Sequence, residues 1–205
     1  MYRQSIGLGL GVLCVVVLSA CSQDPEPVQD PGLLGVVPAD TPYVFTNSRR
    51  LPDPIAGRLA DHAARQLAVQ RVAFDELRRQ LEEGSGEDDL PERFWQAFDV
   101  VDALLAEFEG RETAAQVREL GIEPMPLAVY YGLGILPAAR IEILDATQVD
   151  AMLDRVERKA GLTAARGSLA TQAYRRIDLG PVDAVIALSP DYLIAGLLPD
   201  DLFEP

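Results

Sequence analysis

The chain has 205 residues and a formal net charge of −14, from 18 Lys+Arg against 32 Asp+Glu. An acidic surface repels phosphate backbones and anionic lipid headgroups, so the composition argues against a nucleic-acid-binding protein. For the same reason, any membrane contact is expected to come from an attached lipid and not from a basic face. The chain has two cysteines, Cys14 and Cys21, and the first falls within the leader described next. We therefore expect no intramolecular disulfide, and stability must come from a hydrophobic core.

Residues 1–20 predict a cleaved export signal. Arg3 provides a short cationic head, residues 6–17 are almost wholly apolar, and the small residues Ser19 and Ala20 precede Cys21. This order is typical of a secretory signal peptide. As a helix, residues 6–20 would be only about 22 Å long. A membrane core is about 30 Å thick, so a permanent transmembrane helix is the weaker interpretation.

The stretch Leu18-Ser19-Ala20-Cys21 resembles the lipobox of bacterial lipoproteins. This resemblance implies cleavage between Ala20 and Cys21, a diacylglycerol on the Cys21 sulfur and an acylated new N-terminus. Several acyl chains would hold the protein on a membrane essentially permanently. The alternative is an ordinary signal peptide that leaves Cys21 as a free thiol. We favour lipid attachment, because a single leftover cysteine otherwise lacks a use in an exported chain.

A tether and a destination follow from the next residues. Residues 21–32 comprise the lipidated cysteine and the acidic, proline-rich stretch SQDPEPVQDP, which is typical of a disordered spacer. Ser22 follows the cysteine where an aspartate would retain a lipoprotein in the inner membrane under the enteric sorting rule. The expected location is therefore the bacterial cell envelope, in the outer membrane and facing the periplasm.

Residues 33–205 predict one α+β domain. A strand is expected over 43–46, followed by two helices with apolar residues at helical spacing, from Pro54 to about residue 84 and from Pro91 to Gly110. A shorter helix over 112–120 comes next. Two strands within 126–145 are joined around 132–137, and a helix follows from a capping box at Thr147 and Asp150. The remaining strands are expected at 171–179, 182–188 and 192–197. Short turns favour antiparallel neighbours, so we predict a helical hairpin packed on a mostly antiparallel sheet.

Two stretches resemble a group of uncharacterised proteobacterial lipoproteins: VVPADTPYVFTN at 36–47 and LAVYYGLGILPAARIEILD at 127–145. The mature part of those proteins opens with a VPADTPYVFAN-like segment. The resemblance implies an envelope protein and transfers no catalytic residue. Those proteins are longer, which leaves two alternatives for residues 33–205. They form either a whole α+β domain or the N-terminal part of a longer one, and in the second case an exposed sheet edge is expected to cause association.

The side chains that could do chemistry are few. The single histidine, His62, lies beside Asp61 on a predicted helix, and we expect it to be a surface residue. Six acids crowd the turn between the first two helices and predict either a solvated turn or weak calcium binding: Glu82, Glu83, Glu87, Asp88, Asp89 and Glu92. Aromatic residues provide two further candidates. Tyr130 and Tyr131 beside two glycines would line a groove or pack in the sheet, and the cluster of Phe94, Trp95 and Phe98 would form core or a docking ridge.

These features favour a membrane-anchored, non-enzymatic binding or scaffold module that meets an envelope protein. We expect no cofactor, metal site, catalytic residue or nucleic-acid partner, and the one assigned site residue is Cys21 as the lipid attachment point. One alternative is a periplasmic carrier of lipid or another apolar ligand. The other is a carboxylate-based hydrolase, for which Glu123 and Asp178 are available without any motif around them.

Overall fold

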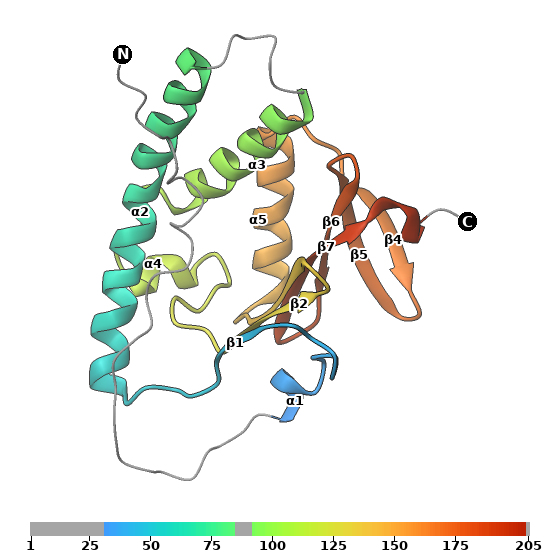
Figure 1. The fold of residues 1–205 in the computed structure, drawn as a ribbon. Helices are drawn as coiled ribbons and strands as arrows, with labels where there is room; N and C mark the ends of the chain where they lie inside the picture. The colour runs from blue at the N-terminus through green and yellow to red at the C-terminus, as the bar shows by residue number, and fades with distance from the viewer. Residues whose placement is uncertain (1–30, 85–91, 204–205) are drawn as a thin grey trace, which may run out of the picture.

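The computed structural model describes residues 31–84 and 92–203 (Figure 1). Cys21, the predicted signal and residues 21–30 of the predicted tether lie outside these residues, as do Glu87, Asp88 and Asp89. The first described element is the short helix α1, Pro31–Leu34.

Seven strands form one sheet in the order β1-β2-β3-β7-β6-β5-β4. Their bounds are Val44–Asn47 (β1), Ala128–Leu133 (β2), Leu136–Glu142 (β3), Ala165–Leu169 (β4), Gln172–Asp178 (β5), Val182–Leu188 (β6) and Tyr192–Pro199 (β7). Every pair of neighbouring strands is antiparallel. Together with the helices, this sheet confirms the predicted α+β class.

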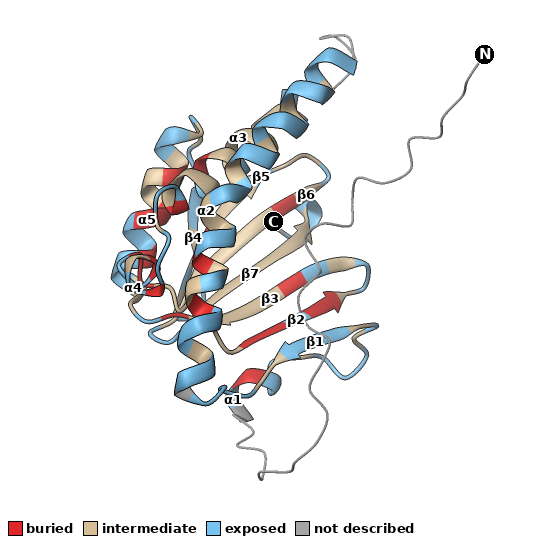
Figure 2. Cartoon of the chain, turned by 90° about the vertical axis from the view of Figure 1, so that its left-hand side faces the viewer, coloured by how far each residue is buried: buried red, intermediate tan, exposed pale blue. Residues whose placement is uncertain are grey.

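Apart from α1, the helices form a layer on one side of the sheet (Figures 1 and 2). Their bounds are Asp53–Gly84 (α2), Glu92–Phe108 (α3), Ala114–Arg118 (α4) and Ala146–Lys159 (α5), and a 3-10 turn, η1, spans Asp200–Phe203. Helix α5 packs against both α3 and the sheet, whereas α2 contacts α3 and α4. The predicted helical hairpin, α2–α3, therefore reaches the sheet largely through α5.

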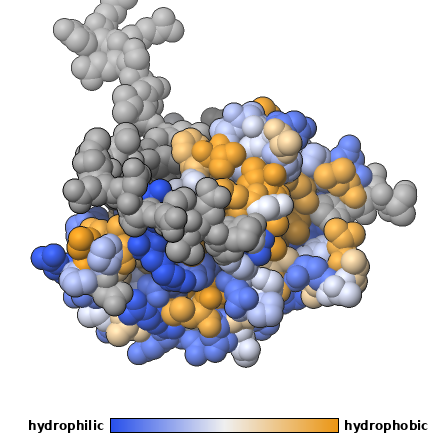
Figure 3. All heavy atoms as spheres, turned by 90° about the horizontal axis from the view of Figure 1, so that it is seen from below, coloured by the Kyte–Doolittle hydropathy of each residue, from blue (hydrophilic) through white to orange (hydrophobic). Residues whose placement is uncertain are grey.

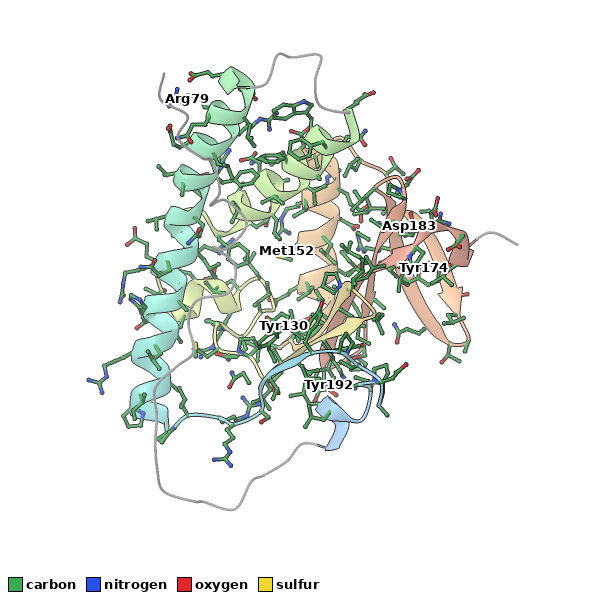
Figure 4. All side chains as sticks on the ribbon, in the orientation of Figure 1. Arg79, Tyr130, Met152, Tyr174, Asp183 and Tyr192 are labelled. Carbon is green, nitrogen blue, oxygen red and sulfur yellow. The ribbon has the colours of Figure 1, made fainter. Side chains whose placement is uncertain are left out.

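The main core lies between α5 and the sheet. Val149, Met152 and Leu153 of α5 pack against Ile186 and other strand residues, and Val149 is fully buried. Figure 4 shows Met152 in this space between the helical layer and the strands. Burying one such side chain stabilises the fold by about 1.5–3 kcal/mol. This interface positions α3, and through α3 it positions the hairpin.

The opposite face of the sheet has a smaller core near its β1 end. Leu33 of α1 is fully buried there against Val129 and Tyr131 of β2 and Ala138 of β3. The Nη1 atom of Arg140 also donates a hydrogen bond of 2.6 Å to the carbonyl of Gly32. These contacts attach the start of the described chain to strands β2 and β3.

Two local predictions differ from the structure. Strand β4 was not predicted, because its residues ARGSL show no apolar alternation and are mostly exposed; its pairing with β5 makes it a strand. Helix α5 starts at Ala146, two residues earlier than the predicted capping box with its N-cap at Thr147 implies. Its N-cap is Asp145, whose side chain accepts hydrogen bonds from the backbone N–H groups of Thr147 and Gln148.

Candidate functional site

A cluster of four aromatic rings lies at the end of the hairpin where α2 ends and α3 begins. Phe98 is its centre: ring centroids lie 5.0 Å from Phe74, 5.0 Å from Phe94 and 5.8 Å from Trp95. All four side chains are half-buried, so the rings pack on one another and also remain partly open to solvent. We call these residues the aromatic tip.

The sequence left two interpretations of Phe94, Trp95 and Phe98: core or docking ridge. The structure agrees with part of each, because the rings form a small core and also keep an exposed side. The sequence pattern grouped Phe94, Trp95 and Phe98 but missed Phe74, which joins them from α2. A pattern that could have predicted the role of Phe74 is the presence of aromatic residues on the facing sides of both helices of one hairpin.

Paired charges surround the aromatic tip. The guanidinium of Arg78 lies 5.9 Å from the Trp95 ring centroid and donates hydrogen bonds to Asp99 at 2.8 Å and Glu82 at 2.9 Å. These two carboxylates raise the pKa of Arg78 above its ordinary value. An aromatic patch bordered by charged side chains that pair with one another has the composition of a protein-binding hot spot.

A polar hollow of about 330 Å³ lies between the start of α3 and the end of β5. It is lined by Glu92, Gln96, Leu162, Thr163, Ile177 and Asp178. The Oδ1 atom of Asp178 accepts a hydrogen bond of 2.8 Å from the Gly180 N–H, which gives this carboxylate a role in the β5–β6 turn. The lining is too polar for the enclosed apolar cavity that a lipid carrier needs.

A network of charges connects α5 to the sheet. The side chain of Arg175 on β5 is 7% exposed and bonds to Asp150, to Asp154 at 2.7 Å and to Glu157 at 2.5 Å. Arg166 on β4 contacts Asp154 and Glu157 as well, each at 3.1 Å. The hydrogen bond from Arg175 lowers the pKa of Asp154 below its ordinary value. We interpret the network as structural, because its members bond to one another and connect α5 to β4 and β5.

This pKa shift predicts a specific acid sensitivity. A carboxyl whose pKa is lower in the folded state stabilises that state above its unfolded pKa of about 3.9, and this contribution disappears as the pH falls through the folded value. We therefore expect Asp154→Asn to show a shallower loss of stability than the unaltered protein between about pH 5 and pH 2. Urea unfolding followed by circular dichroism across this range measures the slope. Asp201→Asn, an exposed site outside the network, should keep the slope of the unaltered protein, and equal slopes for both variants would contradict the prediction.

The other candidates from the sequence are dispersed. His62 is exposed on α2, and its neighbour Asp61 accepts a 2.8 Å hydrogen bond from the Ala114 N–H at the start of α4. Tyr131 is buried and Tyr130 is half exposed on the opposite face of β2, so the two rings do not line one groove. Glu123 forms an ion pair of 3.0 Å with Arg118.

Within the described residues, no group of three or more His, Cys, Asp and Glu side chains is arranged to hold a metal ion. In this same part of the chain, no helix has the length and apolar character needed to cross a membrane. Ala20 and Cys21 fall outside it.

No family model, no curated protein and no solved structure matches the chain.

Proposed function

We propose that this chain is a lipid-anchored, non-enzymatic binding module of the bacterial cell envelope, located in the outer membrane and facing the periplasm. The acylated residue is Cys21, and the partner is an envelope protein that binds the aromatic tip. The layout of residues 1–21 supports the anchor, because a cationic head, an apolar stretch and small residues precede a cysteine in the order of a lipoprotein signal.

The observation that carries the binding role is the position of the aromatic tip. Helix α1, to which the tether connects, lies at the lower end of the molecule, whereas α2 rises past the sheet to the opposite end (Figure 1). With 32 residues, α2 is about 48 Å long. Figure 4 shows Arg79, on the last turns of α2, far from Tyr192 near α1. A domain tethered near α1 would therefore present the aromatic tip away from the membrane.

The two alternatives have less support. A carrier needs an enclosed apolar cavity, and the hollow beside Glu92 and Asp178 is open and polar. A carboxylate hydrolase needs two acids with separate roles in one cleft. In that hollow, the carboxylate of Asp178 already bonds to the Gly180 N–H.

The test is cross-linking of the full chain in intact cells, followed by mass spectrometry and by measurement of labelled palmitate on the protein. We expect one dominant partner and palmitate on Cys21. Trp95→Ala should weaken the partner's affinity by about thirtyfold or more and reduce the adduct accordingly, because truncating an aromatic hot spot costs about 2 kcal/mol or more. Cys21→Ser should incorporate no palmitate and lose the adduct, since the protein then leaves the position that its anchor provides.

Leu169→Ala is the matched control for the aromatic tip. Leu169 is 77% exposed at the end of β4, in a different element from the hairpin. Its truncation should leave both the adduct and the palmitate unchanged. Normal palmitate incorporation into Cys21→Ser would disprove the anchor, and an adduct that survives Trp95→Ala would disprove the binding role of the tip.

A further inference from the structure

The arginines with described side chains fall into two groups, according to whether a described carboxylate contacts them. Ten of them form ion pairs: Arg50, Arg71, Arg78, Arg79, Arg111, Arg118, Arg155, Arg166, Arg175 and Arg176. No described carboxylate contacts the other five. Of these, Arg140 bonds to the Gly32 carbonyl and Arg158 lies in the last turn of α5. The remaining three, Arg49, Arg58 and Arg65, are exposed. These three residues lie close together in the chain, in the loop before α2 and along the first half of α2.

The same stretch of chain exposes an unusual share of apolar side chains. Among the described residues, 17 large hydrophobic side chains are exposed, and seven of them fall between residues 34 and 59: Leu34, Val36, Val44, Phe45, Leu51, Ile55 and Leu59. Phe45 is 63% exposed and Ile55 is 45% exposed. We call these seven residues, together with Arg49, Arg58 and Arg65, the lower face.

The elements that carry the lower face lie at one end of the molecule. Helix α1, strand β1 and the start of α2 are all at the bottom in Figure 1. Seen from this end, hydrophobic and hydrophilic residues are exposed side by side (Figure 3). The outward side of α2 is largely exposed along its length (Figure 2). This end is also where the tether joins the described chain.

The charge of the lower end differs from that of the whole chain. Residues 31–65 contain four arginines and three aspartates, which gives +1, whereas the chain as a whole carries −14. Asp61 of this stretch bonds to the Ala114 N–H. The next carboxylate along the chain after Arg65 is that of Asp75, ten residues further on and about 15 Å along the helix axis. Screening at physiological salt acts over about 8 Å, so the local arginines dominate what a surface at this end would experience.

We propose that the lower face rests on anionic phospholipid headgroups of the membrane that holds the anchor. Guanidinium groups that no carboxylate neutralises bind phosphate; Arg58 uses its Nε for a 3.2 Å hydrogen bond to the Pro54 carbonyl and keeps its other N–H groups for a ligand. The exposed Ile55 and Leu59 lie on the same first turns of α2 and would reach the headgroup layer beside them. The ten residues from Cys21 to Pro31 span at most about 36 Å, so the tether permits contact. The inference rests on the proposed lipid anchor. It differs from the expectation, drawn from net charge, that no basic face meets the membrane.

The experiment uses the full-length protein, purified in its processed form and reconstituted into vesicles. Ile55→Cys is labelled with nitrobenzoxadiazole, and brominated lipids quench the probe where it meets the bilayer. We expect quenching in vesicles of phosphatidylcholine mixed with phosphatidylglycerol, and little quenching in phosphatidylcholine alone. Added salt should reverse the quenching. Leu169→Cys carries the control probe on β4 and should not be quenched in either vesicle.

Single arginine substitutions give the matched comparison. Arg58→Gln should lower the ratio of docked to undocked protein about fivefold, because each arginine near an anionic surface contributes about 1 kcal/mol. Arg158→Gln removes an exposed arginine from the end of α5 and should leave the ratio unchanged. Equal effects of the two substitutions would overturn the proposal.

The proposed anchor and the proposed membrane contact of the lower face can be disproved separately. Flotation with phosphatidylcholine vesicles and the mass of acylated Cys21 test the anchor alone. An anchored protein whose Ile55 probe is not quenched by anionic vesicles would overturn the lower-face inference and leave the anchor intact. The probe could also be shielded from solvent in a way that depends on protein concentration and not on phosphatidylglycerol. This result would show that a second copy of the protein covers the surface, and it would also overturn the lower-face inference.

Discussion

Replacing Gly121 by alanine is expected to be the most damaging single change in the domain. Gly121 has φ +79°, and an added Cβ would lie 2.4 Å from the carbonyl oxygen of Asp145 and 3.0 Å from the Cβ of Gln148. The Gly121 carbonyl also accepts a 2.8 Å hydrogen bond from the Leu144 N–H. The clash is with backbone, so the connection between β3 and α5 would have to move. We expect a loss of at least about 4 kcal/mol in the free energy of unfolding.

Gly110→Ala is the matched control for this prediction. Gly110 has φ +74°, yet an added Cβ would meet nothing within 4 Å. Its cost is the left-handed backbone alone, about 1–2 kcal/mol. Thermal unfolding of the two variants separates the effects, since 1 kcal/mol lowers the Tm of a chain of this size by about 2–4 °C. Similar Tm values for both variants would show that the contact with Asp145 does not constrain the fold.

Arg175→Ala is expected to destabilise the domain by about 3 kcal/mol, because it removes the centre of a buried charge network. The substitution leaves Glu157, which is 13% exposed, with Arg166 as its remaining partner. It also removes the bond from the Arg175 side chain to the Asp150 carbonyl at 3.0 Å, and with it a direct connection between β5 and α5. Asp150 and Asp154 are more exposed, so water compensates for part of their loss.

Arg166→Ala provides the comparison for Arg175. Arg166 contacts two of the same carboxylates, but its side chain is 50% exposed. Exposed ion pairs contribute about 0–1 kcal/mol, so this variant should stay close to the unaltered protein. Urea unfolding gives both free energies. A cost for Arg166→Ala equal to that of Arg175→Ala would show that burial of Arg175 is not what gives the network its strength.

Helix α3 and strands β5 to β7 could be predicted because their patterns are local. The alternation of four and three residues among the apolar positions of α3 defines a helix, and short turns separate the three strands. Strand β4 lacked such a pattern, since its residues become a strand only by pairing with β5. Only part of the aromatic tip could be predicted. The spacing of residues in α3 groups Phe94, Trp95 and Phe98, but the contact of Phe74 with these rings depends on how α2 packs against α3.

The sequence by itself determined that residues 54–84 form a long helix and that the C-terminal part is rich in antiparallel strands. It did not determine which side of α2 is buried. Ile55 and Leu59 fit the apolar pattern but are exposed, whereas Ala60 and Ala64 are buried. The physical reason is that a periodic pattern shows only that a helix has two faces, and the neighbouring elements decide which face is covered. Net charge likewise sums over the whole chain and does not show where the charges lie. Only the fold shows which arginines pair with carboxylates, and therefore which arginines near Ile55 and Leu59 have no such partner.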